Sequence, residues 1–199
     1  MSFATENLLS FPQHRRQPTI VSELSALVDA KLKFKTVLAD PPWKYSNTAS
    51  RAAAENHYDT MTIEQICNEP VCQLIEDSAH LHLWTTNAFL EAAFEVIRAW
   101  GFEYKSCMVW VKPTIGMGNY YRLSHEFLLF GIRGKLKFAR NDVCSWRQAP
   151  RTRHSKKPFC FRELIEQVSP GPYLELYGRE EQPNTDWTVY GNQVERRLF

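Results

Sequence analysis

The sequence predicts an α/β fold in which a mostly parallel sheet is covered by helices on both faces. Short apolar runs rich in β-branched residues alternate along the chain with segments whose apolar residues recur at helical spacing. Proline and glycine separate these runs, as they do at the ends of strands and helices. The chain has 199 residues, of which 44% are hydrophobic and 23% are charged, so it is long and apolar enough for one globular domain with its own core.

The N-terminal part of the chain is predicted to contain an arm, a helix and the first strand. Residues 1–18 show no periodicity and are interpreted as a loose arm, which leaves residues 19–199 as a single domain. Leucine and valine at helical spacing predict a short helix within residues 19–31. An apolar run predicts a buried strand over residues 36–40, and Pro41 ends it because proline cannot continue a strand ladder.

A polar segment and a short helix are expected next. Residues 44–58 are mostly small and polar, and a loop of this length directly after a candidate site is interpreted as a lid. Thr62 and Gln65 have the spacing of a capping box, so a helix is expected to begin there. Pro70 is expected to interrupt that helix.

The rest of the chain is predicted to alternate between strands and helices. Asn87 is expected to cap a helix that Gly101 ends. Pro158 is expected to begin a second helix, because apolar residues follow it at the i, i+3, i+4, i+7 spacing of an amphipathic helix. Further strands are expected over residues 81–86, 107–111, 127–132 and 173–177.

The four residues Asp40-Pro41-Pro42-Trp43 form the first candidate site, directly after a predicted strand. In open α/β sheets, ligands bind at the carboxyl ends of strands. An aromatic amine such as the exocyclic nitrogen of adenine is a poor nucleophile, because its lone pair is delocalised into the ring. Asp40 and the carbonyl of Pro41 could accept its two hydrogens, and Trp43 offers a ring for stacking on the base. The alternative is a structural turn with a packed tryptophan.

Basic residues are concentrated in one segment of a chain whose formal net charge is only +2. Residues 133–157 hold nine Lys or Arg and one acidic residue, a charge of +8, so the remainder of the chain carries −6. Such a segment is either a solvated loop or a surface that contacts phosphates. The predicted nucleic-acid contacts are Arg133, Lys135, Lys137, Arg140, Arg147, Arg151, Arg153 and Lys156.

The remaining composition indicates a soluble protein of a reducing, intracellular compartment. The five cysteines are an odd number without a C-x-x-C pair, so neither a disulfide framework nor a structural zinc site is expected. No signal peptide is recognised, and no apolar segment is long enough to span a membrane. We therefore expect a cytoplasmic protein that holds no metal and binds no membrane.

The tetrapeptide D-P-P-W and seven further motifs resemble the adenine-N6 methyltransferases of the MT-A70-like family. The motifs follow the family's order from about residue 36 to residue 193, most of the chain, so the resemblance is specific. In chain order they are Tyr58-Asp59-Thr60-Met61, Leu81-His82-Leu83-Trp84, Val109-Trp110-Val111-Lys112, Ser124-His125-Glu126, Lys157-Pro158, Glu175-Leu176-Tyr177-Gly178-Arg179 and Gly191-Asn192-Gln193.

The resemblance implies a Rossmann-like methyltransferase domain in which the catalytic motif precedes the cofactor-binding segment. It also implies S-adenosylmethionine as the methyl donor. Glu175, at a strand end, is of the type that binds ribose hydroxyls, and Lys157 is expected to meet the donor's carboxylate; alternatively, Glu175 pairs with Arg179. By the family match, the donor lies against Asp40, Lys157, Glu175, Tyr177, Arg179, Asn192 and Gln193.

The resemblance further implies direct transfer of a methyl group to adenine N6 in nucleic acid, with the base turned out of its stack. Tyr45 and Tyr58 in the lid are candidates to close over the base, although Tyr58 fits a core position equally well. DNA is preferred over RNA, because the chain is a compact domain without an appended RNA-binding module.

Other functions fit parts of the sequence. The alternatives are an RNA adenine methyltransferase and a non-catalytic nucleic-acid-binding subunit built on a methyltransferase scaffold; the intact Asp40 and Trp43 favour an enzyme. A nucleotide-dependent oxidoreductase is disfavoured, because Gly116 and Gly118 lack the third glycine of G-x-G-x-x-G. Besides nucleic acid, the candidate partners are a second copy of the chain and a methyltransferase-like subunit.

Overall fold

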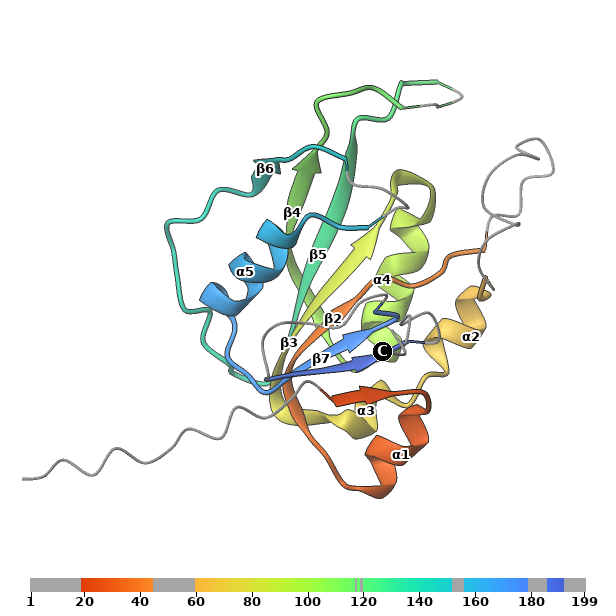
Figure 1. Ribbon diagram of the computed structural model, residues 1–199, viewed down its shortest axis with the longest axis vertical. Coiled ribbons are helices and arrows are strands. Elements are labelled where there is room, and N and C mark those ends of the chain that lie inside the picture. Colours follow the sequence, from red (N-terminus) through yellow and green to blue (C-terminus); the bar gives the residue numbers. More distant parts are fainter. Residues whose placement is uncertain are drawn as a thin grey trace, which may run out of the picture.

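The predicted sheet is present, and the described residues give it eight strands (Figure 1). The structure is a computed structural model that describes residues 19–44, 60–116, 118, 120–151, 156–178 and 186–191. The strands are β1 (Thr19–Val21), β2 (Phe34–Ala39), β3 (Ile75–Thr85), β4 (Glu103–Val111), β5 (His125–Arg133), β6 (Trp146–Gln148), β7 (Tyr173–Leu176) and β8 (Trp187–Tyr190). The helices are α1 (Leu24–Asp29), α2 (Ile63–Cys67), α3 (Val71–Leu74), the 3₁₀ helix η1 (Asn87–Phe89), α4 (Leu90–Ala99) and α5 (Phe159–Val168). Within these ranges, none of the helices has the length and apolar character needed to cross a membrane.

The strand order is β1-β8-β7-β2-β3-β5-β4-β6, and β5 alone among the described strands runs antiparallel to its neighbours. The remaining pairs are parallel, which confirms the mostly parallel sheet. Seven strands therefore end at the same edge, which we call the carboxyl edge. β5 begins at that edge with His125 and ends at the opposite edge with Arg133.

Alternate residues of the central strands enter two cores, one on each face of the sheet. Val37 and Ala39 of β2 belong to the larger core, whereas Leu38 between them belongs to the smaller one. Helices α1 to α4 contribute to the larger core, and α5 covers the smaller core through Phe161 and Ile165. Helices thus cover both faces, as the sequence predicts.

Helix signals in the sequence are confirmed at three helix ends. Thr62 Oγ1 accepts the backbone N–H of Gln65 at 3.2 Å, and the Gln65 side chain accepts the Thr62 N–H at 2.8 Å, which completes the capping box of α2. Pro158 lies directly before α5. Gly101 follows the last turn of α4 with a φ of 79°, a left-handed conformation that favours glycine.

The structure differs from the sequence prediction in three elements. The short helix predicted within residues 19–31 is α1, but it is preceded by a strand that the sequence does not predict, β1, because residues 19–21 pair with β8. The capping role predicted for Asn87 is wrong, since Asn87 is the first residue of η1 and α4 begins at Leu90. Strand β6 lies inside the basic segment and was not predicted. Its three residues are all exposed, so the sequence has no alternation of apolar and polar residues there to predict a strand.

A buried hydrogen-bond chain joins β3 to the residue after α5. His80 Nδ1 and His82 Nε2 each lie 2.9 Å from Ser169 Oγ, and His80 Nε2 lies 3.1 Å from the Leu136 carbonyl oxygen. Because a carbonyl only accepts, the neutral His80 ring carries its proton on Nε2, and its Nδ1 accepts from the Ser169 hydroxyl. His82 Nε2 then donates to Ser169 Oγ. Burial lowers the pKa of both histidines, that of His82 to about 3.

We expect acid to destabilise the fold through His82. The neutral ring stabilises the fold fully above the pKa of an unfolded histidine, about 6.5, and this contribution is lost as the pH falls toward the folded pKa of about 3. Across that window the free energy of unfolding should fall by up to about 1.4 kcal/mol per pH unit. Urea denaturation at several pH values measures this slope, and His82→Gln should reduce it. An unchanged slope in His82→Gln would contradict the assignment.

Candidate active site

The carboxyl edge has a topological switch point between β2 and β7. From β2 the chain proceeds to β3 on one side, whereas β7 lies on the other side of β2. Asp40 directly follows β2, and its N–H donates to the Leu176 carbonyl of β7 at 3.4 Å. Ligands of open α/β sheets bind at such a point. Asp40 and Glu175, which come from these two strands, therefore lie where a ligand is expected.

Backbone hydrogen bonds hold the Asp-Pro-Pro-Trp turn in place. The Trp43 N–H donates to the Pro41 carbonyl at 2.9 Å, and the Met61 N–H donates to the Pro42 carbonyl at 2.8 Å. The Pro41 carbonyl, a predicted acceptor for a target amine, thus uses one lone pair within the turn and retains a second. A parallel bridge between Trp43 and Met61 also attaches the turn to the segment that leads into α2.

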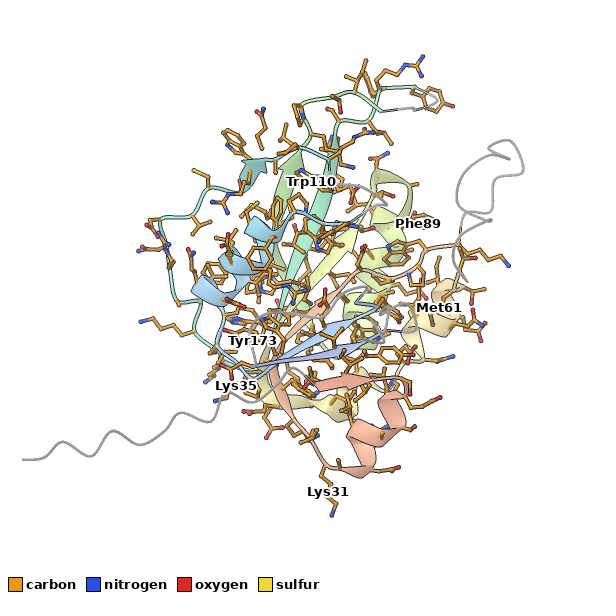
Figure 2. All side chains as sticks on the ribbon, viewed as in Figure 1. Lys31, Lys35, Met61, Phe89, Trp110 and Tyr173 are labelled. Atoms are coloured by element: carbon orange, nitrogen blue, oxygen red, sulfur yellow. The ribbon has the colours of Figure 1, made fainter. Side chains whose placement is uncertain are left out.

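Trp43 packs into the larger core. It is 8% exposed and stacks on Phe89, with 5.4 Å between ring centroids. Its Nε1–H points to the Trp84 carbonyl oxygen, 3.4 Å away. Met61 and Phe89, on the same side of the structure as α2 and α4, are labelled in Figure 2. Stacking of Trp43 on a target base stays a prediction, because this packing already uses one face of the ring.

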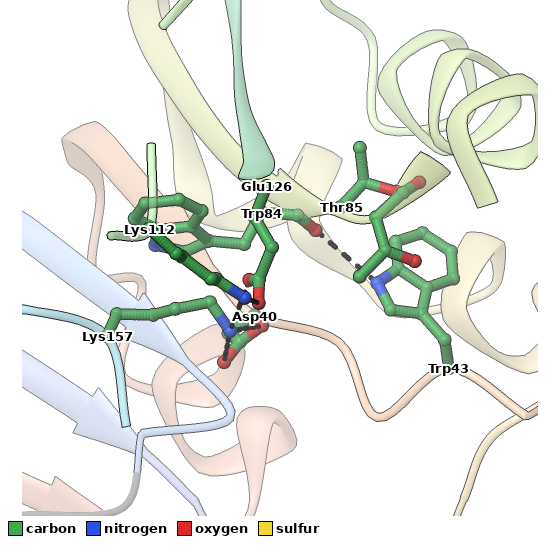
Figure 3. Close-up of polar contacts among 8 residues, drawn as sticks. Asp40, Trp43, Trp84, Thr85, Lys112, Glu126 and Lys157 are labelled. Atoms are coloured by element: carbon green, nitrogen blue, oxygen red, sulfur yellow. Dashed lines mark hydrogen bonds and ion pairs between the residues drawn. The ribbon is translucent and has the colours of Figure 1, made fainter. Parts of the chain in front are cut away.

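Two carboxylates and two ammonium groups alternate at the carboxyl edge (Figure 3). Lys157 Nζ lies 2.8 and 2.7 Å from the two carboxylate oxygens of Asp40, and 3.4 Å from Glu126 Oε2. Lys112 forms a further ion pair with Glu126. We call these four residues the edge cluster. It joins the ends of β2 and β4 to the start of β5 and the segment before α5.

Both ion pairs and contacts with aromatic rings stabilise the side chains of the edge cluster. Lys157 Nζ lies 5.4 Å from the Trp84 ring centroid, and Lys112 Nζ lies 4.5 Å from that of Trp110. Burial alone raises the pKa of Glu126, but the charges and hydrogen bonds of Lys157 and Lys112 outweigh it and hold that pKa below its usual range. Glu126 is therefore ionised and attracts both lysines.

Glu175 forms an ion pair with Arg162 of α5. Arg162 Nη2 contacts Glu175 Oε2, and the two side chains are only 9% and 15% exposed. The Arg162 guanidinium also lies 4.3 Å from the Trp187 ring centroid. Its Nη1 is buried and has no hydrogen-bond partner within the part of the chain that the structure describes. A buried N–H without a partner is costly, so this atom marks a place for a polar ligand group or a water.

Two glycines bring the segments after β7 and β8 together. A Cβ on Gly191 would overlap the Gly178 carbonyl oxygen, and the Gly178 N–H donates to the Tyr190 carbonyl at 2.9 Å. A Cβ on Gly178 would lie 3.2 Å from the Glu175 carboxylate. Without these side chains, the backbone approaches the Glu175 carboxylate closely, as is typical beside a bound ligand.

Tyr177, a predicted donor contact, lies on the other face of the sheet. Its ring packs against the larger core, on the face opposite α5 and Arg162. Burial, followed by the charge of Glu69, raises the pKa of Tyr177 above its ordinary value. Most of the lid and the predicted residues Tyr45, Tyr58, Arg153, Arg179, Asn192 and Gln193 lie outside the described residues.

The basic segment does not form one surface. It leaves β5 at the edge opposite the edge cluster, and β6 then returns beside β4 to the carboxyl edge, where Gln148 is paired with Val111. Arg140, on the way, is exposed and pairs with Asp142. At or near the opposite edge lie Arg133, Lys135, Lys137 and Arg140, and nearer the carboxyl edge lie Arg147, Arg151 and Lys156. Charge counting cannot reveal this division, because it depends on where the chain turns back.

Three residues of the site were not predicted as site residues. Lys112 and Glu126 are part of motifs named in the sequence analysis. The sequence feature that could identify them is a charged residue, Lys112, directly after one apolar strand and a second charged residue, Glu126, near the start of the next strand. Arg162 was not singled out at all. Its signal is an arginine between Phe161 and Leu164, beside the apolar stripe of α5.

We expect Arg162→Met to lower the free energy of unfolding by about 3 kcal/mol, because it leaves the Glu175 carboxylate buried without its cation. Glu175→Gln in the same protein should recover part of the loss. Urea denaturation of both variants measures the coupling. Arg140→Met, which breaks the exposed pair with Asp142, is the matched control and should change stability little. Additive effects of Arg162→Met and Glu175→Gln would contradict the pairing.

The chain is similar to known proteins over most of its length. The family model described as MT-A70 matches residues 34–193, which include every element from β2 to β8. The Homo sapiens N(6)-adenosine-methyltransferase catalytic subunit METTL3 is 31% identical over 175 residues, which cover 82% of this chain and 28% of METTL3. The Type II methyltransferase M.MunI of Mycoplasma sp is 28% identical over 184 residues, which cover 81% of this chain and 78% of M.MunI.

A plant relative matches this chain over a share of its length similar to that of METTL3. The Arabidopsis thaliana protein named N(6)-adenosine-methyltransferase MT-A70-like is 28% identical over 170 residues, which cover 81% of this chain and 24% of the relative. The chain thus spans only about a quarter of METTL3 and of this plant protein. The family match covers most of the chain and includes the Asp40 turn, the edge cluster and Glu175 on a Rossmann-like α/β sheet, and the chain therefore belongs to the MT-A70 family.

Proposed function

We propose that the chain transfers a methyl group from S-adenosylmethionine to the exocyclic N6 amine of adenine in nucleic acid, with DNA as the preferred polymer. The observation that carries the proposal is the position of Asp40, a carboxylate held by Lys157 at the switch point of an MT-A70 sheet. The names of METTL3 and M.MunI, an adenosine N6-methyltransferase and a methyltransferase, support the reaction class.

The residues at the switch point fit a donor that has a nucleoside part and an amino-acid part. Glu175 lies on β7 where a carboxylate accepts from ribose hydroxyls, and the buried Arg162 Nη1 offers an N–H beside it. Lys157 is a cation suited to the donor's carboxylate. When bound, S-adenosylmethionine supplies an electrophilic methyl group on its sulfonium.

Asp40 and the Pro41 carbonyl act on the target amine. Together they accept its two hydrogens, which turns the nitrogen lone pair away from the ring and makes it more nucleophilic. Lys157 contacts both Asp40 oxygens and so fixes the carboxylate before the base arrives, which reduces reorganisation during the reaction. Each carboxylate oxygen accepts more than one hydrogen bond, so the amine still finds a lone pair. The proton released by the methylated amine leaves through Asp40.

Glu126 keeps Lys157 from neutralising Asp40 completely. Its carboxylate lies 3.4 Å from Lys157 Nζ and shares that positive charge with Asp40. Lys112 in turn compensates Glu126. The edge cluster as a whole thus carries two positive and two negative charges, so it brings no net positive charge to the place where the amine would bind.

The preference for DNA follows the relative that is matched over most of its length. This relative, M.MunI, is named a Type II methyltransferase and is matched over 78% of its length. METTL3, which is named for adenosine, is matched over 28% of its length. RNA is the alternative polymer, and a direct comparison of substrates separates the two.

A non-catalytic nucleic-acid-binding subunit is the second candidate. The observation that favours it is the burial of Trp43, which leaves little ring surface for stacking on a base. Calorimetry with S-adenosylmethionine distinguishes the candidates, because a scaffold that does not bind the donor gives no heat.

We expect Asp40→Ala to lower the rate of methyl transfer by about 100-fold or more, because the target amine loses its main acceptor. The assay uses labelled S-adenosylmethionine with duplex DNA, single-stranded DNA and RNA, followed by mass spectrometry of the nucleosides. Circular dichroism checks that the variant is folded, and Asp142→Ala, an exposed carboxylate far from the site, is the control.

Two outcomes of this assay contradict the proposal at different points. A methyl group found on cytosine, or on no base, would refute the proposed reaction. A near-normal rate in Asp40→Ala would refute the role of Asp40 while leaving the reaction intact.

We expect DNA affinity to fall steeply with salt and Arg151→Ala to make that dependence shallower. Each phosphate contact contributes about one unit to the slope of log affinity against log salt. Arg151 lies near the carboxyl edge, whereas Lys135 lies at the opposite edge, so Lys135→Ala should leave the slope unchanged. Fluorescence anisotropy over a salt series measures the slopes. Equal slopes for the parent and Arg151→Ala would place the phosphate contacts elsewhere.

A further inference from the structure

The loop between β4 and β5 carries the most exposed large hydrophobic side chains of the described chain. Ile115, Tyr120 and Tyr121 are 74%, 96% and 89% exposed. Single exposed apolar residues are ordinary, but three within one short loop form a patch that indicates a binding surface. We call the described residues 113–116, 118 and 120–124 the edge loop. It extends beyond the ends of β4 and β5 at the top of Figure 1.

The edge loop begins and ends at the edge cluster. It follows Lys112 and leads to Glu126, which are joined by an ion pair. The Lys112 N–H donates to the Ser124 carbonyl and the Gly116 N–H donates to the Leu123 carbonyl, both at 2.7 Å. These bonds continue the β4–β5 hairpin past the end of the sheet. The tyrosines therefore lie at the end of a hydrogen-bonded stem whose base is at the edge cluster.

The charge of the edge loop favours a polyanion over a protein surface. The residues from Lys112 to Ser124 include Arg122 and no Asp or Glu. Arg122 Nη1 donates to the Gly118 carbonyl at 3.2 Å, which holds the guanidinium against the tip of the loop. The Arg151 guanidinium lies so close to Gly116 that a Cβ there would be 2.7 Å from it. Aromatic rings flanked by arginines are typical of surfaces that bind unpaired bases and their phosphates.

We propose that Tyr120 and Tyr121 stack on bases of the strand that carries the target adenine, with Arg122 and Arg151 on neighbouring phosphates. This rests on the proposed function, since it takes nucleic acid as the substrate. A base turned out of a duplex leaves its neighbours unstacked, and the tyrosine rings restore part of the lost stacking. The edge loop thus holds the strand while the adenine occupies the Asp40 site.

The test is the affinity of the Tyr120→Ala/Tyr121→Ala double variant for a fluorescein-labelled, adenine-containing oligonucleotide. Loss of stacking on even one base should weaken binding about fivefold or more. The Tyr120→Phe/Tyr121→Phe variant keeps both rings and should bind as the parent does. Tyr104→Ala, at the other end of β4 and 39% exposed, is the matched aromatic control and should not change affinity.

A sugar–phosphate chain without bases separates stacking from charge. The parent and the double alanine variant should bind this chain equally, whereas Arg122→Ala should bind it more weakly. The proposal is overturned if the double variant binds the base-containing strand as tightly as the parent, or if it loses affinity for both chains equally. A change in oligomeric state by sedimentation, with unaltered nucleic-acid affinity, would overturn it in favour of a protein interface.

Failure of this proposal can be told apart from failure of the proposed function. A parent protein that methylates no adenine refutes the function itself. Normal methyl transfer by the parent, together with unchanged affinity and unchanged kcat/KM in the double alanine variant, refutes only the role of the edge loop.

Discussion

The ion pair between Lys157 and Asp40 is the interaction on which the rest of the site depends. Lys157 lies between two carboxylates, Asp40 and Glu126, that would repel each other without it. These residues come from segments far apart in the sequence, so the same contact that fixes the Asp40 carboxylate also joins the end of β2 and the start of β5 to the segment before α5. Loss of the ammonium group would therefore loosen the carboxyl edge as well as change the charge beside Asp40.

Helix α5 connects this edge to the interior of the smaller core. Lys157 precedes the helix, Arg162 in its first turns holds Glu175, and Ser169 after its end accepts from His82 and donates to His80. The helix also supplies Glu166, which accepts the Trp187 indole N–H at 2.6 Å. One helix is thus attached to the sheet by polar contacts along its whole length, and a shift of α5 would move both Glu175 and Lys157.

The sequence predicts the alternation of strands and helices well, because the spacing of apolar residues and the prolines that end strands and begin helices are local features of the sequence. It does not predict β1 and β6, which exist through pairing with distant strands. At the site, the position of the Asp40 turn after a strand indicates a site and the resemblance adds Lys157, but neither predicts their direct contact. Arg162 is not predicted because its partner, Glu175, is distant in sequence. The packing of Trp43 on Phe89 likewise depends on where η1 lies, which no local pattern specifies.

The antiparallel direction of β5 has a consequence for how this domain can vary. Parallel strands need long crossovers, which must repack whenever their length changes, whereas β4 and β5 are joined by a hairpin whose stem continues the strand ladder past the sheet. Closing a longer loop costs little additional entropy, since each doubling of its length costs only about 0.6 kcal/mol. The hairpin is therefore a position where residues can be inserted or exchanged with the sheet and the Asp40 turn left as they are.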